Sequence, residues 1–474
     1  MGMEEEQLVI EPQGERPKFS KKLIVIIALI VLVIGTIVAI VIMRGNQTVS
    51  TGTDGVEITS GGTYTISDDI SNGSVVVRAD EADVYLILDS VSIKNSSGPA
   101  IFVESADNVY VELKGESKVT ATATKDYNGA IYSKADLEFS GDGSLEISSS
   151  IDGIVSKDDL VINSGVFVVN AKDEGIVGKD SITINGGDFT ISATSGHGLK
   201  TSNEEKKGDI VINGGKLNIS SGNDGLHSIA NITIASGDIM IAANDDGIHA
   251  DSAVVVDGGA IDITKSYEGI EGGQITVHGG DIKVVASDDG FNAAGGSDSA
   301  KTTASSFRGD ASRVIAISGG NIYVNAGGDG IDSNGNIYIS GGTTYVDGPT
   351  NDGNGAMDYG DSDSEFVITG GTLIAVGSSG MAVNATSAEQ PSVLMNLSGS
   401  HSGDLSFGSI GYTPSKTYNS VLISSPELNV GNSYALMIGD KEIQATSITS
   451  NIVNTGTAGM MPGMGNGRQG GMRR

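Results

Sequence analysis

Short alternations of apolar and polar residues, separated by Gly, Asp, Asn and Ser, fill the chain from about residue 56 to 395. A period of two predicts β-strands, and the small polar residues between them predict tight turns. In the stretch 246–264 we expect three short strands, at 247–250, 253–256 and 260–263. Their inward-facing residues are expected to be Ile248, Val254, Val256, Ile261 and Ile263. No amphipathic helical pattern of useful length interrupts this region.

The alternations recur about every 22 residues, a period typical of solenoids. Each repeat carries a signature in which a polar, mostly acidic residue precedes a glycine and an apolar residue. The residues before the signature glycine are Asp152, Glu174, His197, Asp224, Asp246, Glu268, Asp289 and Asp329. One repeat cannot bury its own apolar face, but coils stacked about 4.8 Å apart can. The pattern predicts an all-β, right-handed parallel β-helix with three faces, the hand being taken from the common case.

Glycines and insertions punctuate this repeat. We expect Gly247, Gly258 and Gly259 to allow the positive φ of tight corners. One interval is longer by about 18 residues, which predicts a loop at 293–311 above the signature face, and a smaller insertion lies at 202–208. Thr417 to Asp440 predicts a few antiparallel strands that cap the open end of the solenoid.

An apolar, uncharged run from Leu23 to Met43 is long enough to span a bilayer. Four basic residues precede this run and only Arg44 follows it closely, so the positive-inside rule predicts a cytoplasmic N-terminus and an extracellular β-helix. The expected localisation is the cell membrane, with a single pass. The expected divisions are a cytoplasmic segment 1–22, an anchor 23–43, a linker 44–55, the β-helix 56–395, the β cap 396–455 and a low-complexity tail 456–474.

The composition narrows the possible partners. The chain has 59 acidic against 28 basic residues and a formal net charge of −31, which argues against nucleic acid and favours cations. It has no cysteine, which excludes disulfides and thiolate metal sites. Aromatic residues make up only 5% of the chain, so a wide stacking platform is not expected. We expect a monomeric ectodomain.

Aligning the coils on the signature glycine stacks equivalent side chains into columns. Stacked carboxylates repel one another unless a cation bridges them, and Ca²⁺ accepts several carboxylate oxygens in flexible geometry. The expected calcium ligands are Asp245, Asp246, Asp251, Asp288 and Asp289. Turn formation is the alternative role of an Asp that precedes Gly, and for any single Asp it stays open.

A second column, two residues after the signature glycine, points outward. It supplies the expected ligand-binding residues, which are Lys200, His227, His249, Glu271 and Asn292. The two histidines are one coil apart, but no third His or Cys is in register with them, so zinc is not expected.

Several motifs occur together in an order that resembles a known family. They are Tyr85-Leu-Ile-Leu-Asp89, Ser156-Lys-Asp-Asp-Leu160, Gly178-Lys-Asp-Ser181, Asp245-Asp-Gly-Ile-His-Ala-Asp251 and Ile423-Ser-Ser-Pro-Glu-Leu-Asn-Val-Gly431. Over residues 56–440 the chain resembles the extracellular carbohydrate-binding β-helix family of anaerobic cellulose-degrading microbes, which is similar in fold to family 9 polysaccharide lyases. The resemblance implies calcium sites and the binding of plant-type polysaccharide, either cellulose or acidic pectic chains.

The lyases also hold calcium with an Asp-Asp-Gly-Phe-Asp motif and use a lysine base from a Gly-x-Gly-Phe-Lys motif. Asp288-Asp-Gly-Phe291 matches the first motif, with Asn292 in place of its last carboxylate. Gly196-His-Gly-Leu-Lys200 resembles the second, but it lies four coils before the first motif rather than after it. The expected function is calcium-dependent polysaccharide binding outside the cell, without an assigned catalytic residue. The alternatives are a lyase with Lys200 as its base and a structural adhesin or spacer.

Overall fold

The structure is a computed structural model that describes residues 47–48, 55–203, 208–294, 310–360 and 364–456. Across these ranges the regular secondary structure is all β, in agreement with the predicted class. No helix among the described residues is long and apolar enough to cross a membrane. The predicted anchor, the C-terminal tail from residue 457 and the central parts of both insertions lie outside the described residues.

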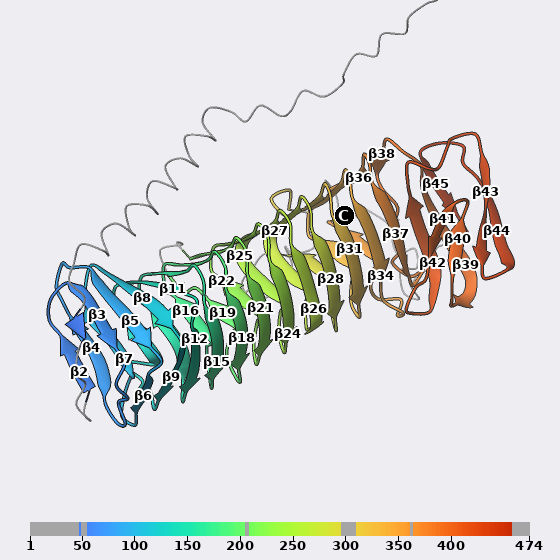
Figure 1. The fold of residues 1–474 in the computed structure, drawn as a ribbon. Helices are drawn as coiled ribbons and strands as arrows, with labels where there is room; N and C mark the ends of the chain where they lie inside the picture. Colours follow the sequence, from blue (N-terminus) through green and yellow to red (C-terminus); the bar gives the residue numbers. More distant parts are fainter. Residues whose placement is uncertain (1–46, 49–54, 204–207, 295–309, 361–363, 457–474) are drawn as a thin grey trace, which may run out of the picture. The chain divides into compact units, whose positions relative to one another are not determined.

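The chain divides into two compact units, Met1–Gln47 and Thr48–Arg474. In the second unit, two long sheets of 26 and 15 strands carry the repeats, and a sheet of 4 strands follows. Figure 1 shows strands of successive coils lying side by side in rows. Equivalent strands pair in parallel along three columns, an arrangement consistent with a parallel β-helix. The hand of the coil stays a prediction.

The first column belongs to the larger sheet. It consists of β2 (Gly55–Ile58), β4 (Ser74–Arg78), β7 (Ile101–Ser105), β10 (Gly129–Ser133), β13 (Asp152–Ser156), β16 (Ile176–Gly178), β19 (Leu199–Lys200), β22 (Leu226–Ser228), the beginnings of β25 (Ile248–Val256) and β27 (Ile270–Val277), β29 (Phe291–Ala293), β32 (Ile331–Ser333) and β35 (Met357–Tyr359).

The second column belongs to the same sheet, because β25 and β27 run continuously through both columns. It consists of β3 (Gly62–Ile66), β5 (Val84–Asp89), β8 (Asn108–Lys114), β11 (Asp136–Gly141), β14 (Asp159–Ile162), β17 (Ser181–Ile184), β20 (Asp209–Ile212), β23 (Asn231–Ile234), the ends of β25 and β27, β30 (Val314–Ile317), β33 (Asn336–Ile339), β36 (Phe366–Ile368) and β38 (Ser387–Ala388). The short β1 (Gln47–Thr48) also belongs to this sheet.

The third column forms the parallel part of the 15-stranded sheet. It consists of β6 (Ser92–Asn95), β9 (Glu116–Ala121), β12 (Ser144–Ser149), β15 (Val166–Ala171), β18 (Asp188–Ala193), β21 (Lys216–Ser221), β24 (Asp238–Ala243), β26 (Ala260–Ser266), β28 (Asp281–Ala286), β31 (Asn321–Ala326), β34 (Thr343–Asp347) and β37 (Thr372–Gly377).

The interior between the columns is apolar, as the alternation predicts. All five residues expected to point inward around 246–264 are at most 1% exposed. Three phenylalanines of successive coils lie in contact. The rings of Phe139 and Phe167 meet edge to face with centroids 5.6 Å apart, and those of Phe167 and Phe189 stack with centroids 5.0 Å apart. The two strands expected at 247–250 and 253–256 are one strand, β25, with a shift of register between Ala250 and Ala253.

The expectation for the glycines holds at only one of the three positions. Gly259 has a φ of 93° and forms a left-handed corner, but neither Gly247 nor Gly258 has positive φ. A Cβ atom at Gly247 would instead lie 2.6 Å from the carbonyl oxygen of Gly269 in the next coil. The signature glycine is therefore required for the close approach of neighbouring coils.

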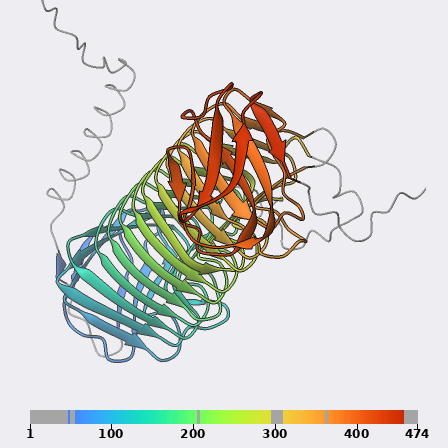
Figure 2. The same cartoon turned by 90° about the vertical axis from the view of Figure 1, so that its right-hand side faces the viewer.

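The parallel pattern ends after β37, where β42 (Tyr418–Ser424) pairs antiparallel with both β37 and β39 (Ser392–His401), and β45 (Ile452–Thr455) joins β39. Figure 2 shows these strands at the C-terminal end of the stacked coils. The small antiparallel sheet consists of β40 (Leu405–Phe407), β41 (Ile410–Tyr412), β43 (Ser433–Ile438) and β44 (Lys441–Ser447). These strands bury a second apolar cluster that includes Val376, Met395, Phe407 and Leu436.

Candidate functional site

The outward positions of the first column form one continuous row of side chains, here called the ladder. Its register confirms the sequence alignment of coils: each ladder residue pairs with its equivalent in the next coil. From N- to C-terminus the ladder reads Phe102, Tyr132, Val155, Val177, Lys200, His227, His249, Glu271, Asn292, Asp332 and Asp358. The ladder therefore changes from aromatic and apolar to basic, and then to acidic.

The signature acids lie three residues before their ladder residues and point toward the next coil. One carboxylate oxygen accepts a hydrogen bond from the backbone amide of the next signature residue in Asp152, Glu174, Asp224, Asp246 and Asp289. The Oδ1 atom of Asp224 lies 3.1 Å from the amide nitrogen of Asp246, and Oδ1 of Asp246 lies 3.2 Å from that of Glu268. Asp224 and Asp246 are 2% and 4% exposed. The signature acids thus have a structural role in the turns, and their second oxygen remains for other contacts.

Asp224 joins two histidines of neighbouring coils through that second oxygen. Its Oδ2 atom lies 2.8 Å from Nδ1 of His227 and 3.2 Å from Nδ1 of His197. The ring centroids of these histidines are 4.3 Å apart, and those of His227 and His249 are 5.0 Å apart. Although burial opposes ionisation, the hydrogen bonds from both histidines hold the pKa of Asp224 well below its usual range.

The alignment missed this contribution of His197, because the residue belongs to the signature column and only its ring reaches the ladder. The sequence does contain a signal for this contact, because each signature residue precedes its ladder residue by only three positions. His197, Asp224 and His227 together offer two imidazole nitrogens and a carboxylate oxygen, a donor set that zinc accepts.

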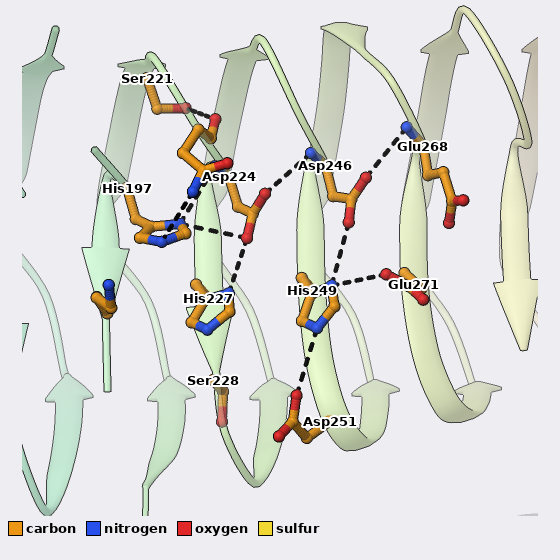
Figure 3. A network of polar contacts seen from close by, with 12 residues as sticks. His197, Ser221, Asp224, His227, Ser228, Asp246, His249, Asp251, Glu268 and Glu271 are labelled. Carbon is orange, nitrogen blue, oxygen red and sulfur yellow. Dashed lines mark hydrogen bonds and ion pairs between the residues drawn. The ribbon is translucent and has the colours of Figure 1, made fainter. Parts of the chain in front are cut away.

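His249 lies among three carboxylates (Figure 3). Its Nδ1 atom is 3.1 Å from Oδ2 of Asp246 and 2.7 Å from Oε2 of Glu271, and its Nε2 atom is 3.4 Å from Oδ1 of Asp251. Burial opposes its charge, but the hydrogen bonds to Asp246 and Glu271 outweigh burial and raise the pKa of His249 to about 11. His249 is therefore a buried cation, 1% exposed, within an acidic network.

The carboxylates around this cation differ in their affinity for protons. Burial opposes the ionisation of Glu271, but the hydrogen bond from His249 lowers its pKa. Burial and the charges of Asp224 and Glu271 raise the pKa of Asp246 to about 7, although His249 lowers it. Asp246 therefore takes up a proton before Glu271 does.

Asn292 joins the next signature acid to the ladder. Its Nδ2 atom donates a hydrogen bond to Oε2 of Glu268 at 2.7 Å, while its buried Oδ1 atom has no hydrogen-bond partner among the described residues. Burial and the neighbouring charges of Glu271 and Asp246 raise the pKa of Glu268 to about 9. An amide oxygen without a partner, beside crowded carboxylates, is suited to a hard cation.

A second group of carboxylates consists of Asp289, Asp329 and Asp332, which each offer one oxygen within 4.8 Å of the others. Burial above all raises the pKa of Asp289 to about 6 and that of Asp329 to about 7. Burial and the charge of Asp358 raise the pKa of Asp332 well above its usual range. These values express the cost of keeping several buried carboxylates ionised together.

The five expected calcium ligands lie in separate groups along the column. Asp245 and Asp246 lie with Asp224, where one oxygen of each is within 4.8 Å of the others, while Asp289 belongs to the group with Asp329 and Asp332. Asp251 contacts His249, and the hydrogen bond to Asp288 raises the pKa of Tyr267 to about 12. The acidic column thus offers two groups of carboxylates that could hold a cation, in different coils.

The five expected ligand-binding residues all lie on the ladder, but they differ in exposure. Lys200, His227 and Glu271 are half-buried, whereas His249 and Asn292 are buried within the network. His249 and Asn292 are buried because neighbouring carboxylates, those of Asp246, Glu268 and Glu271, contact their side chains. The Nζ atom of Lys200 forms an ion pair of 2.6 Å with Oε1 of Glu174, so the candidate lyase base is engaged by a carboxylate.

Two comparisons of the sequence with known proteins give the same description. Residues 40–290 match the family of carbohydrate-binding domain-containing proteins. A carbohydrate-binding domain-containing protein of Acetivibrio thermocellus is 31% identical over 128 residues, which cover 24% of this chain and 45% of that protein. The chain thus spans less than half the length of this relative. A solved polysaccharide lyase-like protein from C. thermocellum, a gadolinium derivative, has a TM-score of 0.42 and 29% identity, covering 44% of this chain and 89% of that one.

Proposed function

The chain belongs to the family of carbohydrate-binding domain-containing proteins, and from this premise we propose that it binds an acidic polysaccharide along the ladder with the help of calcium. The family match carries this proposal, because residues 40–290 include the ladder from Phe102 to Glu271. A row of equivalent side chains about 4.8 Å apart suits a linear polymer better than a small molecule.

Calcium is supported by the donors that the two groups of carboxylates offer. Asp224, Asp245 and Asp246 form one group, and Asp289, Asp329 and Asp332 form the other. The pKa values of Asp246 in the first group and of Asp289 and Asp329 in the second are raised by burial and by neighbouring carboxylates, a repulsion that a divalent cation relieves. The unpartnered Oδ1 atom of Asn292 adds a neutral oxygen of the kind that Ca²⁺ accepts. Bound calcium would supply positive charge for the carboxylates of a uronate chain.

Direct contacts with sugar are proposed for the half-buried ladder residues Lys200, His227 and Glu271. The buried His249 and Asn292 lie beside them in the ladder and would orient Glu271 and Glu268 through the hydrogen bonds described above. A membrane anchor at 23–43 and an extracellular ectodomain are part of the same proposal, and the sequence pattern alone supports them.

The decisive experiment measures the affinity of the purified full-length chain for polygalacturonate in calcium and in excess chelator. We expect chelation to weaken binding at least tenfold, because the uncovered acidic column repels uronates. The double variant Asp289→Asn/Asp329→Asn disrupts only one of the two groups, so in calcium its affinity should lie between those of the wild type in calcium and in chelator. Unchanged wild-type binding in chelator would refute the role of calcium.

Two controls make this result specific. The double variant Asp188→Asn/Asp281→Asn removes the same charge from exposed positions of the third column and should bind like the wild type. Cellulose oligosaccharides carry no carboxylates, so their binding should not depend on calcium. If neither ligand binds and the chain is still displayed on the cell surface, the alternative of a structural adhesin is favoured.

A further inference from the structure

Three lysines of successive coils follow the first-column strands on the N-terminal part of the ladder. Lys134, Lys157 and Lys179 directly follow the strands β10, β13 and β16, and all three are exposed. Backbone hydrogen bonds keep them in register: the amide of Lys157 donates to the carbonyl of Ser133 at 2.8 Å, and the amide of Lys179 donates to that of Ser156 at 2.9 Å. We call these residues the lysine column.

Like most lysines of the described ranges, the three members of the lysine column form no ion pair. Lys118 pairs with Glu146 and Lys200 with Glu174, each at 2.6 Å. Across the described ranges, by contrast, no carboxylate oxygen lies within 4.0 Å of the ammonium groups of the lysine column. The column therefore presents three neighbouring ammonium groups that are not ion-paired, in a chain with a formal net charge of −31.

An aromatic cluster lies under the lysine column instead. The Nζ atom of Lys134 is 5.5 Å from the ring centroid of Tyr127 and 5.7 Å from that of Phe102, and Nζ of Lys157 is 5.5 Å from that of Tyr132. The three rings contact one another, with centroids between 4.7 and 6.0 Å apart. Cation–π contacts orient the ammonium groups and leave their N–H donors free for an anion.

The lysines also influence one another. Burial of its stem and the neighbouring charge of Lys179 lower the pKa of Lys157, although Asp152 raises it. Exposed like charges in adjacent coils are unfavourable, and an anion that contacts several of them relieves the repulsion. A polymer with repeated negative charges does so better than a single small anion, because its charges can match successive coils about 4.8 Å apart.

We propose that Lys134 and Lys157, held over the rings of Phe102, Tyr127 and Tyr132, form together with Lys179 of the next coil a subsite that binds the carboxylates of an acidic polysaccharide without calcium. This rests on the proposed function and extends it to coils that hold neither group of carboxylates. The half-buried rings of Phe102 and Tyr127 offer apolar area for the less polar face of a sugar ring. A uronate chain that follows the ladder would thus contact the neighbouring lysine column along its N-terminal half and calcium along its C-terminal half.

The test measures polygalacturonate binding by the full-length chain in excess chelator, so that calcium makes no contribution. The variant Lys134→Gln/Lys157→Gln/Lys179→Gln should lose affinity about tenfold, which corresponds to about 1.4 kcal/mol. Binding by the wild type should also weaken as salt rises from low to physiological concentration. An unchanged affinity of the triple variant would overturn the proposal.

The matched control is Lys94→Gln/Lys172→Gln/Lys216→Gln, which removes the same net charge from exposed lysines elsewhere on the coils and should bind within twofold of the wild type. If both triple variants lose affinity equally, the effect depends only on the net charge of the protein, and the proposed subsite is refuted. Cellulose oligosaccharides should bind both variants alike, and a loss confined to the first would contradict recognition of carboxylates. If a single-stranded oligonucleotide binds more tightly than polygalacturonate and depends on the same lysines, the subsite binds nucleic acid and the proposal of a glycan ligand is overturned.

The two proposals fail separately. If chelation does not affect wild-type binding, calcium bridging is refuted while the lysine column can still account for binding. If the triple lysine variant is unaffected in chelator, the lysine column is refuted while calcium bridging remains intact.

Discussion

Replacing Asp152 by Asn should stabilise the protein at neutral and alkaline pH and leave it unaffected in acid. Asp152 is the first signature acid and lies away from both groups of carboxylates, at 1% exposure. Its Oδ1 atom accepts the backbone amide of Glu174 at 3.1 Å, and its Oδ2 atom accepts the side-chain amide of Asn128. An Asn side chain keeps the first bond, and rotation of the Asn128 amide restores the second. The substitution therefore removes the charge while preserving the hydrogen bonds.

The magnitude follows from the cost of burying this charge. Burial above all raises the pKa of Asp152 from 3.8 to about 7. The folded state thus keeps a proton that the unfolded chain loses, and stability falls as pH rises from about 4 to 7. At about 1.4 kcal/mol per pKa unit, the ionised carboxylate costs the folded state about 4 kcal/mol above pH 7. Asp152→Asn should recover most of this amount at pH 8 and none of it at pH 4.

The assay is equilibrium denaturation of wild type and variant in chelator at pH 4, 6 and 8. The difference between the two chains is compared across pH, because a long repeat array does not have to unfold in one step. Asp188→Asn, on the exposed side of β18, is the matched control and should show no pH-dependent gain. A difference that is the same at pH 4 and pH 8 would show that the buried charge of Asp152 is not the cause.

Two further substitutions test the ends and the interior of the solenoid. Asp347→Ala should destabilise the protein by about 3 kcal/mol in denaturant titrations. The Asp347 carboxylate is fully buried and accepts hydrogen bonds from the hydroxyl of Tyr412 and the amide of Ser415, both at 2.7 Å. Asp404→Ala, at an exposed position, is the control. Phe167→Ala should cost about 3–5 kcal/mol by opening a cavity between the rings of Phe139 and Phe189, whereas Val168→Ala at the outward neighbouring position should cost much less, as measured by the midpoint of thermal unfolding.

The fold was predictable because the period of the repeat determines the register. Once the coils are aligned on the signature glycine, period-two alternation separates inward residues such as Ile248 from outward residues such as His249, and the structure has both as expected. The same alignment predicted the order of the ladder from Lys200 to Asn292. Register is a property of the backbone, and a repeated sequence contains it directly.

The direction of side chains was harder to predict from the sequence, because it depends on contacts between columns. The ring of His197 reaches Asp224 and His227 although its backbone lies in the signature column, and alignment by column separates these residues. The predicted role of Gly247 was wrong for a similar reason. Glycine is required there because a Cβ atom would collide with the carbonyl oxygen of Gly269 in the next coil, and not because of a positive φ. The lysine column was missed because Lys134, Lys157 and Lys179 follow the strands and belong to neither column.

The ladder shows why a solenoid can combine different modes of binding on one face. Each coil contributes one rung, and a substitution in one rung changes its chemistry without changing the register of its neighbours. Phe102 and Tyr132 begin the ladder beside the lysine column, while Asp332 and Asp358 end it beside crowded carboxylates. Under the two proposals, an acidic polymer would be attracted to the first end and repelled by the second unless cations are present. Calcium would therefore control how much of the ladder a bound chain occupies, and the length of oligogalacturonate that gains affinity should increase when calcium is added.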